Sequence, residues 1–308
     1  MRVFSRKMDN VVEVYDTDID DTGLELVRTF AVPPRSTFKE PGSEGHAVTR
    51  SRDRLIYATD TAVLRVDPDG REEWRFDLGA RGPGCGVSYT DVELSADDSL
   101  VWVYAPNAMA DRGREDEWIV LDAVTGELRD RHVLPTVGHG GDQYPLSDGR
   151  MLLEVGEGQD GIQIYLGTPA AAPHDYGWGD RSLHGVSPDG TRFVTVGHDA
   201  EDLAVHAFPG GEVLFRCTLA DFGFDEDADG VSLEWSPGFL DDDTVVAVVY
   251  GAYGEEDDTD WWRHLRVDAH TGRLLGEIEI TTVSQYDMEV LGDGTYVITD
   301  TDGTLRRM

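Results

Sequence analysis

The sequence has few lysines, few cysteines and no long apolar segment. Lys7 and Lys39 are the only lysines among 26 basic residues, which stand against 61 acidic residues and leave a formal charge of -35. Because phosphate binding needs a positive surface, this charge argues against a nucleic-acid partner. No apolar run approaches the roughly 18 residues of a membrane-spanning helix. We therefore expect neither a nucleic-acid nor a membrane partner.

The cysteine content and the first residues bear on the compartment. Cys85 and Cys217 can form at most one disulfide, which excludes a scaffold held by disulfides. The first nine residues contain no apolar stretch of the kind a signal peptide needs. We therefore expect a reducing, cytoplasmic location.

The hydrophobic share of 40% is enough for a folded core, which excludes a disordered chain. High-GC coding would explain the arginine bias, whereas adaptation to a salt-rich cytoplasm would explain both the acid excess and the shortage of lysine. At low salt the net charge should destabilise the compact state. The same field favours a neutral or cationic ligand over an anionic one.

A turn pattern recurs along the chain. Its aspartates are 44, 51, 41, 53 and 51 residues apart, at Asp53, Asp97, Asp148, Asp189, Asp242 and Asp293. A run rich in β-branched and aromatic residues follows each turn, as in 100–104 and 245–250, and predicts a strand. A second turn with glycine, as in 122–127 and 268–272, joins two short strands in most units. No long window has helical periodicity.

These repeats resemble those of WD40-like and YVTN-like β-propellers. The resemblance is carried by the Ser-Pro-Asp-Gly turn at 187–190, its degenerate copies, and the Asp…Thr-Gly hairpins at 122–127 and 268–272. It covers nearly the whole chain and implies a fold rather than an activity.

The resemblance and the spacing predict an all-β fold with one propeller domain over residues 1–308. We expect six blades of four antiparallel strands, with seven as the alternative. Within residues 1–30, the segment 24–30 is expected to supply the fourth strand of the last blade, which would remove a free edge. The segment 11–15 is then an extra strand or half of a seventh blade.

The long connections of such a propeller all emerge on one face, which also receives the starts of the innermost strands. A polar or aromatic residue stands at each start. The predicted ligand-binding residues at this channel mouth are His46, Tyr89, Asp91, His139, Asp142, Tyr144, His184, Glu234, Tyr286 and Asp287. We expect a small molecule or a peptide to bind there. The alternative is a passive channel that is filled with water and binds no specific ligand.

An enzyme is the second hypothesis, and the sequence leaves the choice open. A lyase, hydrolase or cyclase would use acid–base groups among His46, His139, His184, Asp91 and Asp142. The three histidines could also hold a divalent metal. No nucleotide-binding, serine-hydrolase or zinc motif is present, so no cofactor is required.

Two further features are weaker candidates. Asp225, Asp227 and Asp229 match the start of a calcium loop, although the twelfth position is Ser236 rather than glutamate. Cys85 lies in a glycine-rich loop after Arg81 and would need a positive environment to act as a nucleophile.

Four aromatic residues are predicted on the face with the long loops. Tyr176 and Trp178 lie in a glycine-containing loop and could form a lid or contact a partner, or could simply pin the loop down. Trp261 and Trp262 could form a wall for a sugar or an aromatic ligand, or could pack between blades.

Overall fold

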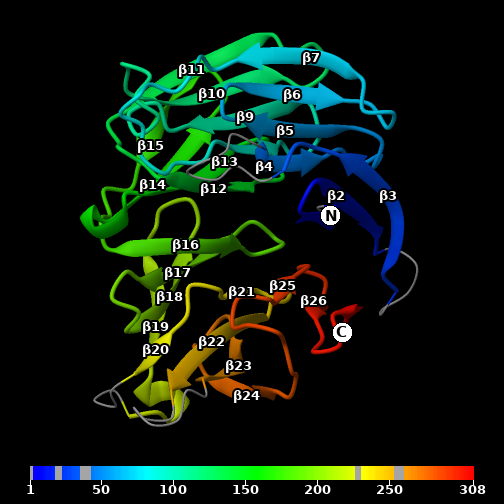
Figure 1. Ribbon diagram of the computed structural model, residues 1–308. Helices are drawn as coiled ribbons and strands as arrows, with labels where there is room; N and C mark the ends of the chain where they lie inside the picture. Colours follow the sequence, from blue (N-terminus) through cyan, green and yellow to red (C-terminus); the bar gives the residue numbers. More distant parts are fainter. Residues whose placement is uncertain (1–2, 18–22, 35–42, 226–229, 253–259) are drawn as a thin grey trace. The chain divides into compact units, whose positions relative to one another are not determined.

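A computed structural model describes residues 3–17, 23–34, 43–225, 230–252 and 260–308 (Figure 1). The described residues form antiparallel sheets in which most strands follow one another in chain order. The chain divides into two compact units, residues 2–16 with 25–179 and residues 17–24 with 180–308. Among the described residues, no helix is long and apolar enough to cross a bilayer.

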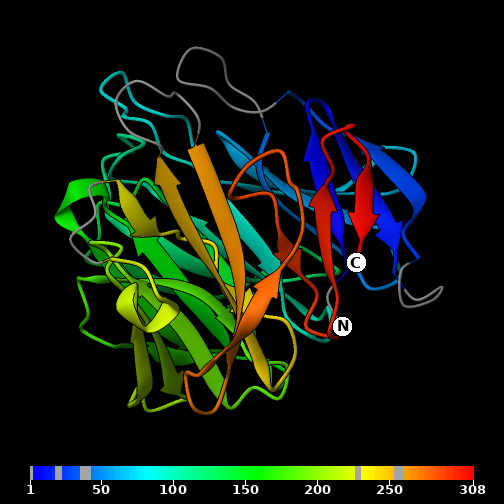
Figure 2. The same cartoon turned by 90° about the horizontal axis from the view of Figure 1, so that it is seen from below.

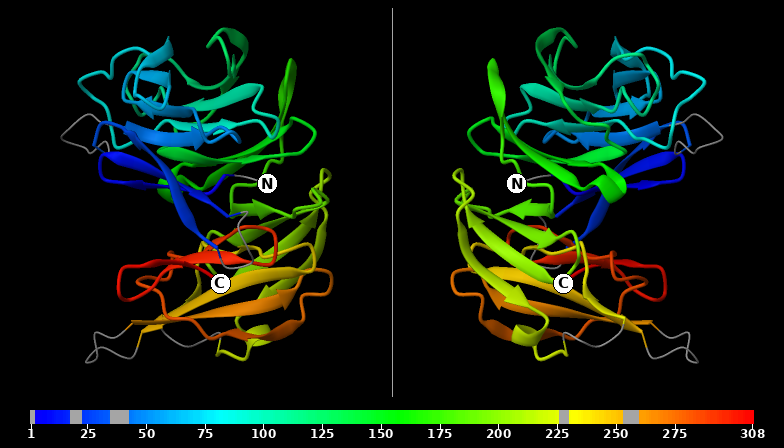
Figure 3. Two further views of the ribbon diagram at one scale, coloured as in Figure 1. Left: turned by 90° about the vertical axis from the view of Figure 1, so that its right-hand side faces the viewer. Right: turned by 90° about the vertical axis from the view of Figure 1, so that its left-hand side faces the viewer.

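The first unit contains four sheets. Their strands are β1 (Ser5–Met8), β2 (Val11–Asp16) and β3 (Glu25–Ala31); β4 (Ser43–Val48), β5 (Leu55–Thr59), β6 (Ala62–Val66) and β7 (Glu72–Asp77); β8 (Asp91–Leu94), β9 (Leu100–Ala105), β10 (Asp116–Asp122) and β11 (Leu128–Leu134); and β12 (Gly140–Pro145), β13 (Met151–Gly156), β14 (Ile162–Thr168) and β15 (Ala171–Asp175). A short 3₁₀ helix, η1 (Gly158–Asp160), follows β13. Figure 3 shows these sheets in blue to green.

The second unit contains three sheets. Their strands are β16 (Arg181–Val186), β17 (Arg192–Gly197), β18 (Asp202–Ala207) and β19 (Val213–Thr218); β20 (Val231–Leu233), β21 (Gly238–Phe239), β22 (Thr244–Ala252), β23 (Asp260–Asp268) and β24 (Leu274–Ile278); and β25 (Glu289–Val290), β26 (Tyr296–Thr299) and β27 (Leu305–Arg307). The 3₁₀ helix η2 (Ala220–Phe222) follows β19. Both β20 and β21 pair with β22, one of the long twisted strands drawn in yellow to orange in Figure 2.

The described residues therefore form seven sheets, so the prediction of six blades is wrong and the alternative of seven is confirmed. The additional sheet comes from the N-terminal segment, where β2 pairs with β1 on one side and with β3 on the other. The segment 24–30 was expected to complete the last blade, but its strand β3 pairs with β2 instead. In the described residues the last sheet has three strands of its own, β25 to β27. One domain over residues 1–308 stays a prediction.

The aspartate turns form as the sequence predicts, because neighbouring side chains close them. The Oδ1 atom of Asp189 accepts hydrogen bonds from Ser187 Oγ at 2.6 Å and from Thr191 N at 2.9 Å. Asp97 repeats this arrangement with Ser95 Oγ at 2.7 Å and Ser99 N at 3.0 Å. Each turn leads from the innermost strand of a sheet to the next strand.

The hydrophobic cores lie between neighbouring sheets. Ile56 and Val63 of the β4–β7 sheet pack with Val103 and Ile119 of the β8–β11 sheet. The Nε1 atom of Trp74 donates to the carbonyl of residue 123 in that neighbouring sheet at 3.1 Å. Each fully buried side chain of this size contributes roughly 1.5–3 kcal/mol. The cores hold the inner strands β4, β8 and β12 in place.

Candidate functional site

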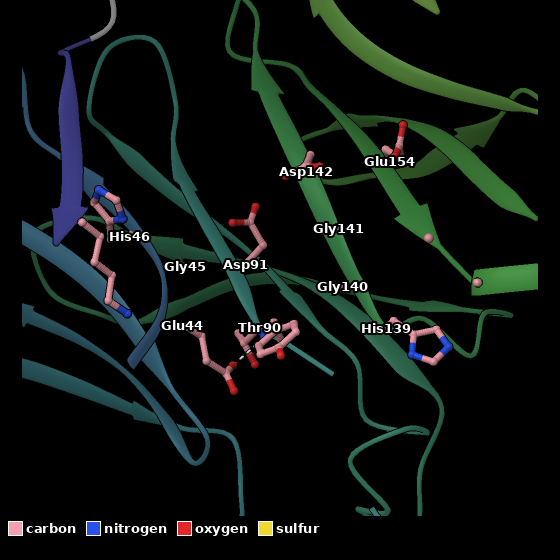
Figure 4. A pocket seen from close by; sticks show the side chains of 14 residues that line it. Glu44, Gly45, His46, Thr90, Asp91, His139, Gly140, Gly141, Asp142 and Glu154 are labelled. Carbon is pink, nitrogen blue, oxygen red and sulfur yellow. Dashed lines mark hydrogen bonds between the residues drawn. The ribbon is translucent and has the colours of Figure 1, made fainter. Parts of the chain in front are cut away.

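A pocket of about 560 Å³ opens in the first unit, where the inner strands of three sheets and β1 come together (Figure 4). It is lined by charged, aromatic and glycine residues. They are Lys7, Glu44, Gly45, His46, Tyr89, Thr90, Asp91, His139, Gly140, Gly141, Asp142, Glu154, Gly156 and Gly158.

Hydrogen bonds set the order of the strands around the pocket. The amide of Gly45 on β4 donates to Thr90 O at 3.0 Å, immediately before β8. The amide of Tyr89 donates to His139 O at 2.7 Å, immediately before β12. On the other side, His46 Nε2 lies 3.2 Å from Ser5 Oγ of β1. The pocket wall therefore runs in the order β1, β4, β8, β12.

Gly45 is required by the close approach of β4 to β8. A Cβ atom at this position would lie 2.7 Å from Asp91 Oδ1 and 2.9 Å from Asp91 Cα. Side chains do not tolerate such contacts with backbone, so only glycine lets the two strands approach this closely. The glycine thereby brings His46 and Asp91 into one wall.

Asp91 is held from the core side. Gln143 Nε2 donates to Asp91 Oδ2 at 2.8 Å, and Gln143 Oε1 accepts from Trp118 Nε1 at 2.8 Å. Gln143 is only 5% exposed and Trp118 is fully buried, so both side chains have fixed rotamers. This chain of hydrogen bonds orients the Asp91 carboxylate before any ligand arrives.

Asp142 and Glu154 form a like-charged pair in the same wall. They are direct partners in the register of β12 and β13, and Figure 4 shows both at one end of the pocket. Asp142 is exposed, whereas Glu154 is buried. Like charges directly opposite each other in a sheet are destabilising.

Glu44 is a buried acid at the edge of the pocket. Its side chain is 1% exposed, and its Oε2 accepts a hydrogen bond from the amide of Thr90. Its Oε1 lies 3.6 Å from Arg81 Nη1, which is also 3.2 Å from Asp60 Oδ1. Burial raises the pKa of Glu44 to about 7, the Thr90 amide opposes this shift, and the charge of Asp60 adds to it.

Tyr89 and His139 add an aromatic ring and an imidazole to the pocket lining. Tyr89 is 38% exposed, and His139 lies on the exposed side of the same wall. The Nδ1 atom of His139 is 3.0 Å from the carbonyl of Val87, which ties the ring to the loop before β8. These groups can contact a bound molecule without being buried themselves.

The pocket unites five of the predicted mouth residues, namely His46, Tyr89, Asp91, His139 and Asp142. Tyr144 is on β12 but does not line the pocket. His184, Glu234, Tyr286 and Asp287 belong to the second unit. Their binding role stays a prediction.

The second-unit residues have local partners. Asp287 accepts a hydrogen bond from Thr299 Oγ1 at 2.7 Å, which stabilises the turn region of the last sheet. A hydrogen bond to Glu234 is the largest cause of the raised pKa of Tyr286. Burial lowers the pKa of His184 to about 3, so this imidazole is neutral at physiological pH.

Sequence reasoning missed Lys7, Glu44, Thr90 and Glu154. For Glu154 a signal was present, because it is a lone carboxylate inside the apolar strand 151–155. Lys7 is one of only two lysines in the chain, but nothing in its neighbourhood shows that β1 lies beside β4.

The prediction of a metal held by histidines finds no geometric support in the described residues. In the part of the chain that the structure describes, no group of three or more His, Cys, Asp or Glu side chains is arranged to hold a metal ion. Asp227 and Asp229 of the predicted calcium loop lie outside the described residues, so calcium binding there stays a prediction.

The loop aromatics contact one another or the core. Tyr176 stands 4.9 Å from Trp178, ring centre to ring centre. Trp261 stacks on Phe224 at 5.7 Å, and Trp262 Nε1 donates to Thr282 Oγ1 at 2.8 Å. These contacts agree with the packing interpretation, while a ligand wall or lid at these residues stays a prediction.

No family model and no curated protein matches the sequence. Many solved structures resemble the fold, and three of them follow. BamB from Moraxella catarrhalis is 13% identical, with 99% of this chain and 80% of that chain covered and a TM-score of 0.53. The Dos1 propeller is 10% identical, with 97% and 89% covered and a TM-score of 0.55. The Neurospora crassa Pan2 WD40 domain is 10% identical, with 99% and 87% covered and a TM-score of 0.55.

Proposed function

With a β-propeller fold as the premise, we propose that this protein is a binding module whose first-unit pocket takes a positively charged group of a small molecule or peptide. The observation that carries the proposal is the like-charged pair of Asp142 and Glu154 in the same wall as Asp91. Propellers host many unrelated functions, so the proposal rests on this site and not on the fold.

The chemistry of the pocket suits an ammonium or a guanidinium. Asp91, Asp142 and Glu154 offer carboxylate acceptors, and hydrogen bonds between charged groups are the strong ones. Tyr89 adds a partly exposed ring, to whose face a cation is attracted. The volume of about 560 Å³ falls in the range usual for small-molecule sites, roughly 300–1,000 Å³.

The test is calorimetric titration with agmatine and cadaverine, with butanol as the uncharged control. We expect the two cations to bind and butanol not to bind. Replacing Asp142→Asn removes one acceptor charge and should weaken binding about tenfold or more, since such bonds contribute roughly 1.5–3 kcal/mol. The matched control is Asp69→Asn, an equal charge change in the exposed turn between β6 and β7.

An equal effect of the two variants would show that only the overall negative charge attracts the cation. Failure of every cation to bind the wild-type protein would refute the proposed function. Both measurements need the same ionic strength, because screening changes long-range attraction.

An enzyme is the second candidate, favoured by one observation. The same pocket brings His46 and His139 together with Asp91 and Asp142. In that case His46→Gln and His139→Gln would abolish turnover of a cationic substrate. Cytoplasmic location stays a prediction from the sequence.

A further inference from the structure

Glu44 connects the pocket with the interior of the first unit. It lines the pocket, yet its side chain is only 1% exposed. Its Oε2 accepts the hydrogen bond from the amide of Thr90, drawn as a dashed line in Figure 4. Its Oε1 is also buried and has no hydrogen-bond partner among the described residues. Because Oε2 already has a donor, a proton on this carboxyl group belongs on Oε1.

The arginines near Glu44 direct their hydrogen bonds to other groups. Arg81 Nη1 lies 3.6 Å from Glu44 Oε1, beyond hydrogen-bond distance. It donates instead to Asp60 Oδ1 at 3.2 Å and to Ser88 O at 3.0 Å. Arg112 Nη2 donates to Asp60 O at 2.6 Å. A negative charge on Glu44 is therefore only partly compensated, which is why burial prevails and raises the pKa to about 7.

The pocket side of Glu44 carries further charged and titratable groups. Lys7 on β1 is a cation, and His46 on β4 and His139 before β12 are imidazoles. The other acids of the lining are Asp91, Asp142 and Glu154. Their negative charges oppose a further one on Glu44, and a cation that binds among them removes this opposition.

We propose that a cation entering the pocket displaces a proton from the Glu44 carboxyl group, so that cations bind more tightly as the pH rises through neutrality. This inference rests on the proposed function and adds the regulation of the same site by pH. The O–H bond at Oε1 breaks, its electron pair stays on the carboxylate, and the proton passes to the solvent. The coupling is reciprocal, so a proton on Glu44 weakens cation binding by the factor by which the cation weakens proton binding.

The expected change in affinity follows from the fraction of ionised Glu44. With a pKa of about 7, about one tenth of the molecules are ionised at this group at pH 6 and about nine tenths at pH 8. If the ionised form is the one that binds, the affinity rises about tenfold between these pH values.

The experiment is calorimetric titration of the wild-type protein with agmatine at pH 6, 7 and 8 and at one ionic strength. Agmatine keeps its charges over this range, since groups of the lysine and arginine type lose their protons above about pH 10. We expect the affinity to rise about tenfold from pH 6 to pH 8. Titrations at pH 7 in phosphate and in HEPES, whose ionisation enthalpies differ, should show the release of about half a proton per bound agmatine.

The deciding variant is Glu44→Gln, which removes the titrating group but can still accept the hydrogen bond from the Thr90 amide. It should release no proton and should bind agmatine with nearly the same affinity at pH 6 and pH 8. The matched control is Glu115→Gln, an equal charge change at an exposed position before β10. This control should keep the pH dependence of the wild-type protein.

Asp60→Asn is an independent variant in case the first one disturbs β4. It removes a negative charge that contributes to the raised pKa of Glu44, and asparagine can still accept a hydrogen bond from Arg81. We expect the rise in agmatine affinity to move to lower pH. A rise at the same pH as in the wild-type protein would overturn the assignment of the proton to Glu44.

The outcomes separate the two proposals. If Glu44→Gln keeps the pH dependence and His46→Gln or His139→Gln loses it, the proton comes from an imidazole and the inference is overturned. Equal agmatine affinity at pH 6 and pH 8 in the wild-type protein, without proton release, would also overturn it, while the binding of cations stands. If neither agmatine nor cadaverine binds at any of the three pH values, both proposals are overturned.

Discussion

Replacing Glu44→Gln should change how the stability of the protein depends on pH. The carboxyl group is buried, and the pKa rises from an ordinary 4.5 to about 7 in the folded protein. The folded state therefore holds this proton more tightly than the unfolded chain does. The stability that comes from the bound proton is complete below about pH 4.5 and is lost as the pH rises through about 7.

The size of the effect follows from the shift. A change from 4.5 to about 7 corresponds to about 3 kcal/mol, at about 1.4 kcal/mol per pKa unit. Most of it falls between about pH 5 and about pH 8. Glutamine has no charge to desolvate and can still accept the hydrogen bond from the Thr90 amide. We therefore expect Glu44→Gln to gain about 2–3 kcal/mol relative to wild type over that interval.

The assay is urea unfolding followed by tryptophan fluorescence. It is run at about pH 5 and about pH 8, the two ends of that interval, and at one high salt concentration that screens the surface charges. The quantity compared is the difference in free energy of unfolding between wild type and variant. The control is Glu201→Gln, at an exposed turn before β18. Its difference in free energy of unfolding from wild type should be the same at the two pH values. A wild-type-minus-variant difference that stays constant between the two pH values would refute the reasoning about Glu44.

Three further predictions concern other parts of the chain. Asp116 is fully buried and accepts four hydrogen bonds, so Asp116→Asn should lower the free energy of unfolding by about 2–4 kcal/mol in urea titrations; a loss under about 1 kcal/mol would contradict this. Gly272→Ala should lower the melting temperature more than Gly303→Ala. Both glycines have positive φ, but only a Cβ at position 272 would meet a ring carbon, that of Phe215 at 2.7 Å. Equal melting temperatures of the two variants would argue against this contact. Iodoacetamide at neutral pH should modify half-exposed Cys85 and spare Cys217, whose pKa burial raises to about 11; mass spectrometry of the native protein checks this, and equal labelling would disprove it.

The turns of the propeller could be predicted because their hydrogen bonds are local. At Asp189 the hydrogen-bond partners Ser187 and Thr191 are two residues away in the sequence. The residues of the motif are therefore the same residues that close the turn. The blade count was wrong because the first sheet lacks this motif. Its β1–β2 turn contains Asp9 with a φ of +47° and no Ser-x-Asp pattern, so the repeat was not visible there.

The pocket could be predicted only where it depends on position along a strand. His46, Asp91 and Asp142 stand at or near the beginnings of inner strands, which the repeat locates. Glu154 enters the site through its pairing with Asp142 across two strands, and Lys7 through the position of β1 beside β4. Such long-range pairings cannot be predicted from the neighbouring residues in the sequence, so Glu154 and Lys7 were missed.

The scarcity of lysine has a practical consequence. Since Lys7 lines the pocket and Lys39 is the only other lysine, reagents that acylate primary amines have very few targets on this protein besides the N-terminus. Acetylation of Lys7, read peptide by peptide, should therefore fall when a bound compound covers this amino group. A compound library can be screened in this way without a labelled ligand, by the protection that each compound gives to a single amino group.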